Sequence, residues 1–124
     1  MRAGPPYGPI ALALAPDGRA LATQDIVAGT AVWDVTAGIR ILDLGRVDAS
    51  VPAVAWSPDG RSLARAAGSG RIEVWDPAGG RLRRAWRGHE DAVRTLAFAP
   101  DGRWLASGGT DGTVRLWEVA PGGR

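Results

Sequence analysis

The chain has 124 residues, one histidine, no cysteine and a formal net charge of +2. The absence of cysteine excludes disulfides, thiolate metal sites and a cysteine nucleophile, and so small a net charge gives no broad attraction to nucleic acid. Every positively charged side chain is an arginine, since lysine is absent, as is asparagine. This bias indicates a GC-rich, bacterial coding sequence.

Taken in chain order, the sequence predicts short strands separated by turns. Residues 1–9 form a short N-terminal lead that could act as a closing strand, and the apolar run 10–15 predicts a first strand. A Pro-Asp-Gly-Arg turn follows at Pro16 and returns at Pro58 and Pro100, each time 42 residues further on. A fixed period of this length is the signature of a repeat protein.

A second landmark keeps the same period. Trp33, Trp75 and Trp117 stand 42 residues apart, and an acidic residue follows each of them. We therefore predict three copies of one unit, covering about 10–50, 51–92 and 93–124.

Within a unit, the pattern predicts a four-stranded antiparallel meander. In the third unit, strands are expected at 93–99, 104–107 and 113–119, with Val114 and Leu116 on one side of a half-buried last strand. More polar runs at 39–44 and 81–87 supply the fourth strands of the first two units. The sequence ends after the third strand of unit three, so only residues 1–9 remain to supply its fourth.

The residues of the third unit resemble those of a WD40 repeat from end to end. The resemblance is carried by Gly88-His89, Ala97 to Gly102, Leu105 to Gly109, Asp111-Gly112-Thr113 and Leu116-Trp117-Glu118. It extends over essentially the whole chain and weakens toward the N-terminus. It implies an all-β fold, namely a WD40 β-propeller segment of three four-stranded antiparallel blades, with an incomplete ring and the last outer strand missing.

The resemblance also implies a structural role for a group of polar side chains. His89, Ser107 and Asp111 have the composition of a nucleophilic triad, but in WD40 blades these positions and Trp117 form a buried hydrogen-bond network. Trp75 and Trp33 keep the tryptophan of this network. The other positions are Val47, Arg65 and Ser69 in unit two and Pro5, Thr23 and Val27 in unit one. We therefore expect the third blade to be the most rigid.

Signatures of enzymes and cofactor sites are missing from the residue inventory. A P-loop needs a lysine that the chain lacks. One histidine without cysteine cannot build a histidine-based metal site, and the acidic residues are spread along the chain rather than clustered as in a calcium loop. We expect no enzymatic activity, cofactor or metal.

The resemblance implies a non-catalytic scaffold that binds a protein or peptide, as the docking or sensing part of a bacterial signalling assembly. We expect no membrane association, because no run approaches the roughly 18 apolar residues of a spanning helix. A cytoplasmic location is expected because the absence of cysteine is compatible with a reducing compartment. The candidate partner-binding residues are expected on the connections between blades and between second and third strands: Arg46, Asp48, Asp25, Arg65, Arg71, Glu90, Asp91 and Arg94.

Three blades leave two sheet faces open, and three arrangements fit this count. Two copies could pair into a six-bladed ring, another WD40 chain could supply the missing blades, or the chain could be a fragment of a longer WD40 protein without independent function. A rival function is nucleic-acid binding by the strip from Arg81 to Arg87, which contains Trp86. We favour a solvated outer strand for this strip, since edge strands commonly carry positive charge.

Overall fold

The computed structural model describes residues 10–25, 27–47 and 52–119 and is built from strands. The strands of the first sheet are β1 (Ile10–Leu14), β2 (Ala20–Asp25), β3 (Gly29–Asp34) and β4 (Ile39–Gly45). Those of the second are β5 (Val54–Trp56), β6 (Leu63–Ala66), β7 (Arg71–Asp76) and β8 (Arg81–Arg87), with a short 3-10 turn, η1 (Gly68–Gly70), between β6 and β7. The third sheet contains β9 (Val93–Phe98), β10 (Trp104–Gly109) and β11 (Val114–Glu118).

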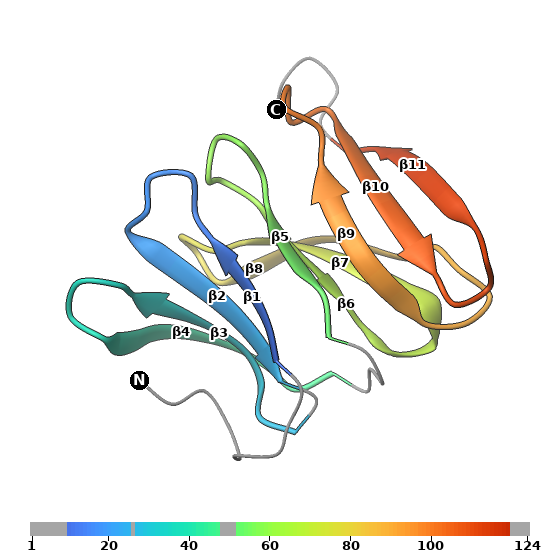
Figure 1. Ribbon diagram of the computed structural model, residues 1–124. Helices are drawn as coiled ribbons and strands as arrows, with labels where there is room; N and C mark the ends of the chain where they lie inside the picture. The colour runs from blue at the N-terminus through green and yellow to red at the C-terminus, as the bar shows by residue number, and fades with distance from the viewer. Residues whose placement is uncertain (1–9, 26, 48–51, 120–124) are drawn as a thin grey trace.

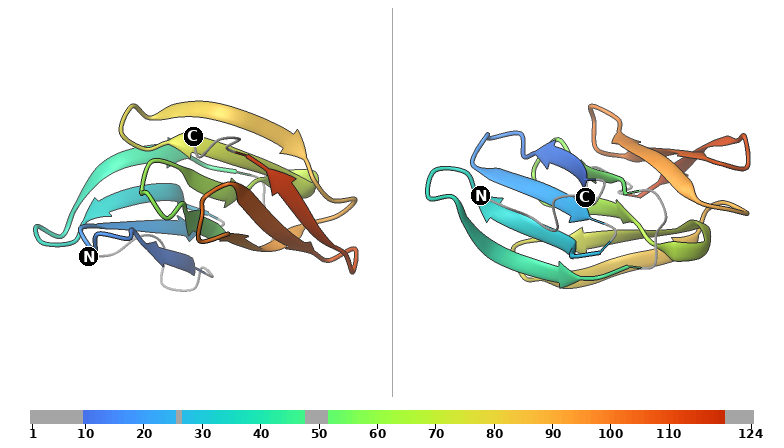
Figure 2. Two further views of the ribbon diagram at one scale, coloured as in Figure 1. Left: turned by 90° about the horizontal axis from the view of Figure 1, so that it is seen from above. Right: turned by 60° about the horizontal axis from the view of Figure 1, so that its bottom comes forward.

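Each sheet is an antiparallel meander in which sequence neighbours pair. The three sheets, which we call blades one, two and three, lie next to one another in chain order (Figure 1). Their first strands β1, β5 and β9 are adjacent, and the fourth strands β4 and β8 run along one side of the molecule (Figure 2). The fold class predicted from sequence is confirmed: within the described residues, the third sheet has three strands and no fourth.

The repeated Pro-Asp-Gly-Arg sequence builds the same turn in every blade. In blade one, the Asp17 carboxylate accepts a hydrogen bond from the Arg19 amide at 2.9 Å, and the amide of Gly18 donates to the Ala15 carbonyl at 2.9 Å. Gly18 has φ of +72°, a conformation that costs glycine little and other residues more. The equivalent turns of blades two and three have the same bonds and nearly the same glycine φ.

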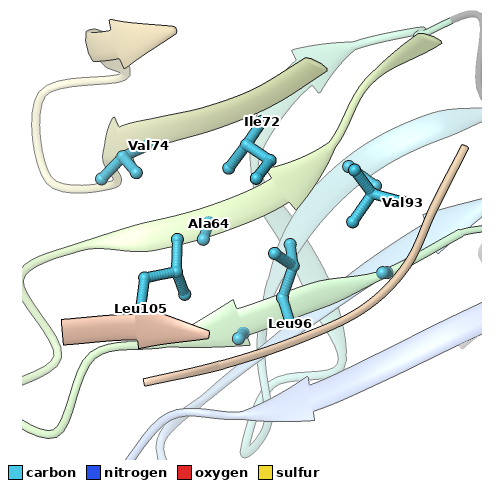
Figure 3. Close-up of a cluster of buried hydrophobic side chains, with 9 residues drawn as sticks. Ala64, Ile72, Val74, Val93, Leu96 and Leu105 are labelled. Carbon is cyan, nitrogen blue, oxygen red and sulfur yellow. The ribbon is translucent and has the colours of Figure 1, made fainter. Parts of the chain in front are cut away.

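Apolar side chains fill the two seams between neighbouring blades. Between blades one and two, Ala22, Val32 and Leu44 pack against Val54 and Leu63. Between blades two and three, a larger cluster joins one face of blade two to Val93, Leu96 and Leu105 of blade three (Figure 3). Among the residues that the structure describes, the apolar side chains thus form two clusters at the seams rather than one central core, and blades are stabilised by burying faces on their neighbours.

One expectation for β11 is wrong. The alternating pattern of this strand predicted that Val114 and Leu116 belong to its buried side, but both are strongly exposed, whereas Arg115 and Trp117 are half-buried. The reason lies in the assembly of blades: the side of β11 that carries Trp117 packs on blade two, and the other side faces away from blade two, the one described neighbour of blade three.

Candidate functional site

The polar group expected in blade three forms one connected set of hydrogen bonds. His89 follows β8, Ser107 lies on β10, and Asp111 lies in the turn between β10 and β11. His89 Nδ1 is 3.1 Å from Asp111 Oδ1, and His89 Nε2 is 2.8 Å from Ser107 Oγ. Trp117 Nε1 donates to Ser107 Oγ at 2.9 Å.

The donors and acceptors of this set fix its proton arrangement. The indole N–H of Trp117 can only donate, so Ser107 Oγ accepts from it and can give its own proton to His89 Nε2. His89 Nδ1–H then donates to the ionised Asp111 carboxylate. Every member is paired, which is the condition under which a buried polar network stabilises a fold.

Asp111 also collects bonds from the chain around it. Its carboxylate accepts from the Thr113 hydroxyl at 2.7 Å, and from the amides of Glu90 and Thr113 at 3.1 Å each. The hydrogen bond from the Thr113 side chain, with these amides and His89, holds the pKa of the Asp111 carboxyl well below its usual range. The carboxylate therefore stays ionised and joins the entry of blade three to the β10–β11 turn.

Ser107, His89 and Asp111 are hydrogen-bonded in the sequence found in a nucleophilic triad, but the serine and histidine are not accessible to a substrate. Ser107 and His89 are both buried. Ser107 Oγ is already held between the imidazole and the Trp117 indole. A substrate carbonyl has no path to the hydroxyl in this arrangement.

Blades one and two replace this network with other polar groups. In blade one, Trp33 Nε1 donates to Thr23 Oγ1 at 3.0 Å. In blade two, Arg65 occupies the serine position, and its Nε donates to Glu73 Oε1 at 2.8 Å, while Trp75 Nε1 donates to the same oxygen at 2.9 Å. Arg65 also stacks over the Trp75 ring, 5.1 Å from its centroid. A buried ion pair thus replaces the neutral hydroxyl.

Sequence reasoning missed Glu73 and a second buried group, Gln24 and Thr30. Gln24 Nε2 donates to the Ala66 carbonyl of blade two at 2.9 Å, and Thr30 Oγ1 donates to Gln24 Oε1 at 3.2 Å. The 42-residue register held a usable signal, since Gln24 aligns with Ala66 and Gly108. A long polar side chain among small residues indicates a bond that crosses to another blade.

Of the eight predicted partner-binding residues, five are exposed, two are buried and one lies outside the described residues. The face formed by the connections between blades and by the turns between second and third strands is called the connection face below. Five of the predicted residues are exposed there: Arg46, Arg71, Glu90, Asp91 and Arg94. Asp48 lies outside the described residues.

The expectation that Asp25 and Arg65 are displayed to a partner is wrong, because both are buried. Asp25 Oδ1 accepts hydrogen bonds from the Val27 and Ala28 amides, at 2.6 and 2.9 Å, and so shapes the turn after β2. Arg65 is committed to Glu73 and to the Gly45 carbonyl, which accepts from its Nη1 at 2.9 Å. Both charges are used inside the protein.

The arginine strip on β8 is an outer strand whose side chains contact the protein itself. Arg83 donates to Ser62 Oγ at 2.6 Å and lies 3.7 Å from the Asp76 carboxylate. Arg84 donates to the Glu118 carbonyl at 3.1 Å and stacks over Trp86. Arg87 donates to the carbonyls of His89 and Glu90, at 3.3 and 2.9 Å.

A hollow of about 690 Å³ lies at the opposite end of the blades, between the Pro-Asp-Gly turns of blades two and three. Arg61, Arg83 and Arg84 line it together with Asp59 and Asp101. The two acidic groups are tied to their own turns, since each accepts from the amide of the following arginine. The sequence analysis did not predict this hollow, because residues of two different repeats form it together.

Sheets of this meander type, stacked face to face with buried polar ties, define a segment of a β-propeller. The family model of WD40, described as WD domain, G-beta repeat, matches residues 43–76 and 80–118. The chain therefore belongs to the WD40 family, which is generally non-catalytic and whose domains generally bind proteins or peptides.

A solved structure, "Structure of U3-55K", is similar to the chain, with 27% identity and a TM-score of 0.85. The match covers 94% of this chain and 38% of that one, so the chain spans well under half of the neighbour's length. None of the curated proteins matches the sequence. Within the described part of the chain, no helix has the length and apolar character needed to cross a membrane.

Proposed function

We propose that this chain is a non-catalytic scaffold segment that binds a protein or peptide through its connection face. The observation that carries the proposal is a contrast in access. The groups with chemical potential, His89 and Ser107, are buried and mutually bonded, whereas Glu90, Asp91 and Arg94 next to them are exposed. Loops on a rigid scaffold are a common location for binding residues.

The bound partner is, in this proposal, a protein or peptide that contacts charges of both signs on blades two and three. Arg46 and Arg71 extend the same face toward blade one. We further propose that the segment is the docking or sensing part of a bacterial signalling assembly in the cytoplasm. The lysine-free and asparagine-free composition supports a bacterial source, and family membership supports docking.

The experiment compares two triple alanine variants, one at each end of the blades, for partner capture from the native host. The first removes charge from the connection face, by Glu90→Ala, Asp91→Ala and Arg94→Ala. The control removes exposed arginines from the Pro-Asp-Gly turns at the opposite end, by Arg19→Ala, Arg61→Ala and Arg103→Ala. Proteins captured by the wild type and the control but lost by the first variant, with unchanged circular dichroism, support the proposal. Loss in the control alone would place binding at the turns instead.

A further inference from the structure

Neighbouring blades always meet through two different faces. The face that a blade turns to the next blade is called the forward face, and the one that it turns to the preceding blade is called the backward face. At the seam between blades two and three, the forward face carries small residues, Ala53, Ala55, Ala64 and Ala66, beside Ile72 and Val74. The backward face carries the larger Val93, Leu96 and Leu105 (Figure 3). The large side chains of the backward face therefore fill the space that the small side chains of the forward face leave at the seam.

The forward face of blade three has no described neighbour. Val32 and Val74 are equivalent residues of the first two forward faces and are 3% and 5% exposed, but Leu116 at the same position of blade three is 67% exposed. The small residues recur too, as Thr95, Ala97, Ala106 and Gly108. Over its three described strands, blade three thus repeats a surface that is buried twice elsewhere in the chain; the fourth-strand side chains of that surface, Leu44 and Trp86 in blades one and two, have no described counterpart.

The backward face of blade one is open along its first strand β1, although Trp33 on β3 is buried. Val54 and Leu96 on the backward faces of blades two and three are 9% and 8% exposed, whereas the equivalent Leu12 is 64% exposed. Leu14, which occupies the position of Trp56 and Phe98, is also exposed. This face offers large apolar side chains, as the buried backward faces do.

The turns give a third, independent sign of the same missing contact. A Cβ on Gly60 would lie 3.8 Å from Cδ of Pro16 in the preceding blade, and one on Gly102 would lie 3.6 Å from Cδ of Pro58. At the equivalent Gly18, no atom of the described residues lies within 4 Å. Pro100 is the turn proline for which no following blade is described.

We propose that two copies of this chain join head to tail, with the forward face of blade three on the backward face of blade one. Both junctions of such a pair are identical, so the assembly closes with twofold symmetry into six blades, within the usual range of four to eight. Forward-to-forward pairing is disfavoured, since it places small residues opposite small residues and leaves gaps where close packing is required. The assembly is independent of the docking function proposed above.

The first test is the mass of the purified chain by light scattering over a dilution series. The expected mass is twice the 12.9 kDa of one chain. Leu116→Asp and Leu12→Asp, on opposite faces, should each abolish the dimer without loss of strand signal in circular dichroism. A monomeric wild type, a chain that assembles without limit, or dimers that survive both substitutions would overturn the proposal.

The second test distinguishes head-to-tail from like-to-like pairing by cysteine cross-linking, which is clean because the chain has no cysteine. Leu12→Cys and Ala106→Cys place thiols at positions whose equivalents, Leu96 with Ala64 and Val54 with Ala22, share a seam. A mixture of the two variants should give the mixed disulfide at least tenfold faster than either variant alone. Val35→Cys, exposed in a turn, is the control for random collision. Faster cross-linking of Ala106→Cys with itself would contradict the geometry.

Discussion

Replacing His89 with alanine tests whether the blade-three network is a structural element. The substitution leaves the buried Ser107 hydroxyl without its acceptor, which costs about 1–3 kcal/mol. It also opens a cavity where the buried imidazole lay, and large-to-small changes at buried sites cost about 2–5 kcal/mol. Asp111 keeps its bonds from Thr113 and the Glu90 amide, so its loss is small. Because both figures describe the loss of the same imidazole and partly overlap, they are not summed in full, and we expect destabilisation of about 3–5 kcal/mol.

For a chain of this length, such a loss corresponds to a fall in Tm of roughly 10–20 °C. The assay is thermal unfolding followed by tryptophan fluorescence and circular dichroism, at fixed protein concentration, because assembly would shift Tm. The matched control is Val47→Ala, the equivalent position of blade two, which is half-buried and should cost about 1 kcal/mol. If His89→Ala lowers Tm no more than Val47→Ala does, the network does not stabilise the blade and the reasoning fails.

Three further predictions concern charged groups. Arg65→Met alone removes the buried guanidinium from the Glu73 carboxylate, which keeps the Trp75 indole bond and the exposed Arg71 at 4.0 Å, and should cost about 3 kcal/mol. Adding Glu73→Gln should recover at least about 1 kcal/mol of it in urea unfolding, and additive losses would show that the pair is not coupled. The lowered pKa of Asp111 predicts that wild-type stability exceeds that of Asp111→Asn above the ordinary carboxyl value of about 3.9, and that this advantage is lost as the pH falls from there through the depressed folded-state pKa, since the unfolded chain takes up the proton first. Thermal melts from acidic to neutral pH measure it, and a constant gap would contradict the pKa argument. Because Arg83 and Arg84 contact the protein itself, we expect no binding of single-stranded DNA even at low salt in fluorescence anisotropy; salt-sensitive binding that both alanine substitutions weaken would favour the nucleic-acid function.

The fold could be predicted from the sequence because local signals agreed with a period. The Pro-Asp-Gly turns each place glycine at positive φ, and the tryptophans mark the third strand of each blade. The predicted range 81–87 is reproduced by β8, and β1, β4 and β9 differ from their predicted ranges by one residue at one end. Short turns and alternating strands are determined by neighbouring residues, so one sequence suffices to locate them.

Burial of charged side chains could not be predicted in the same way. Arg65 and Asp25 were assigned to the surface because charged residues on connections are usually exposed. The structure buries Arg65 because Glu73, Trp75 and Gly45 lie within reach. Two of these partners lie on β7 and the third on β4 of the neighbouring blade, and such a combination is not visible as a sequence pattern. The burial of Leu116 was predicted wrongly for the opposite reason. The alternation of β11 places Leu116 on the expected side of the strand, but no described blade covers that side.

The two seams of the protein are fixed by different chemistry. Gln24 donates to Ala66, Trp56 donates to the Ala13 carbonyl at 2.7 Å, and Arg65 donates to Gly45, all across the first seam. At the second seam the equivalent residues are Ala66, Phe98 and Ser107. The alanine and phenylalanine have no side-chain donor, and the Ser107 hydroxyl already bonds His89 and Trp117. The repeats are therefore not interchangeable parts. An engineered array could be made by copying one unit or by exchanging the first and second. It would keep the apolar stacking but lose the polar contacts that determine which units pack next to each other.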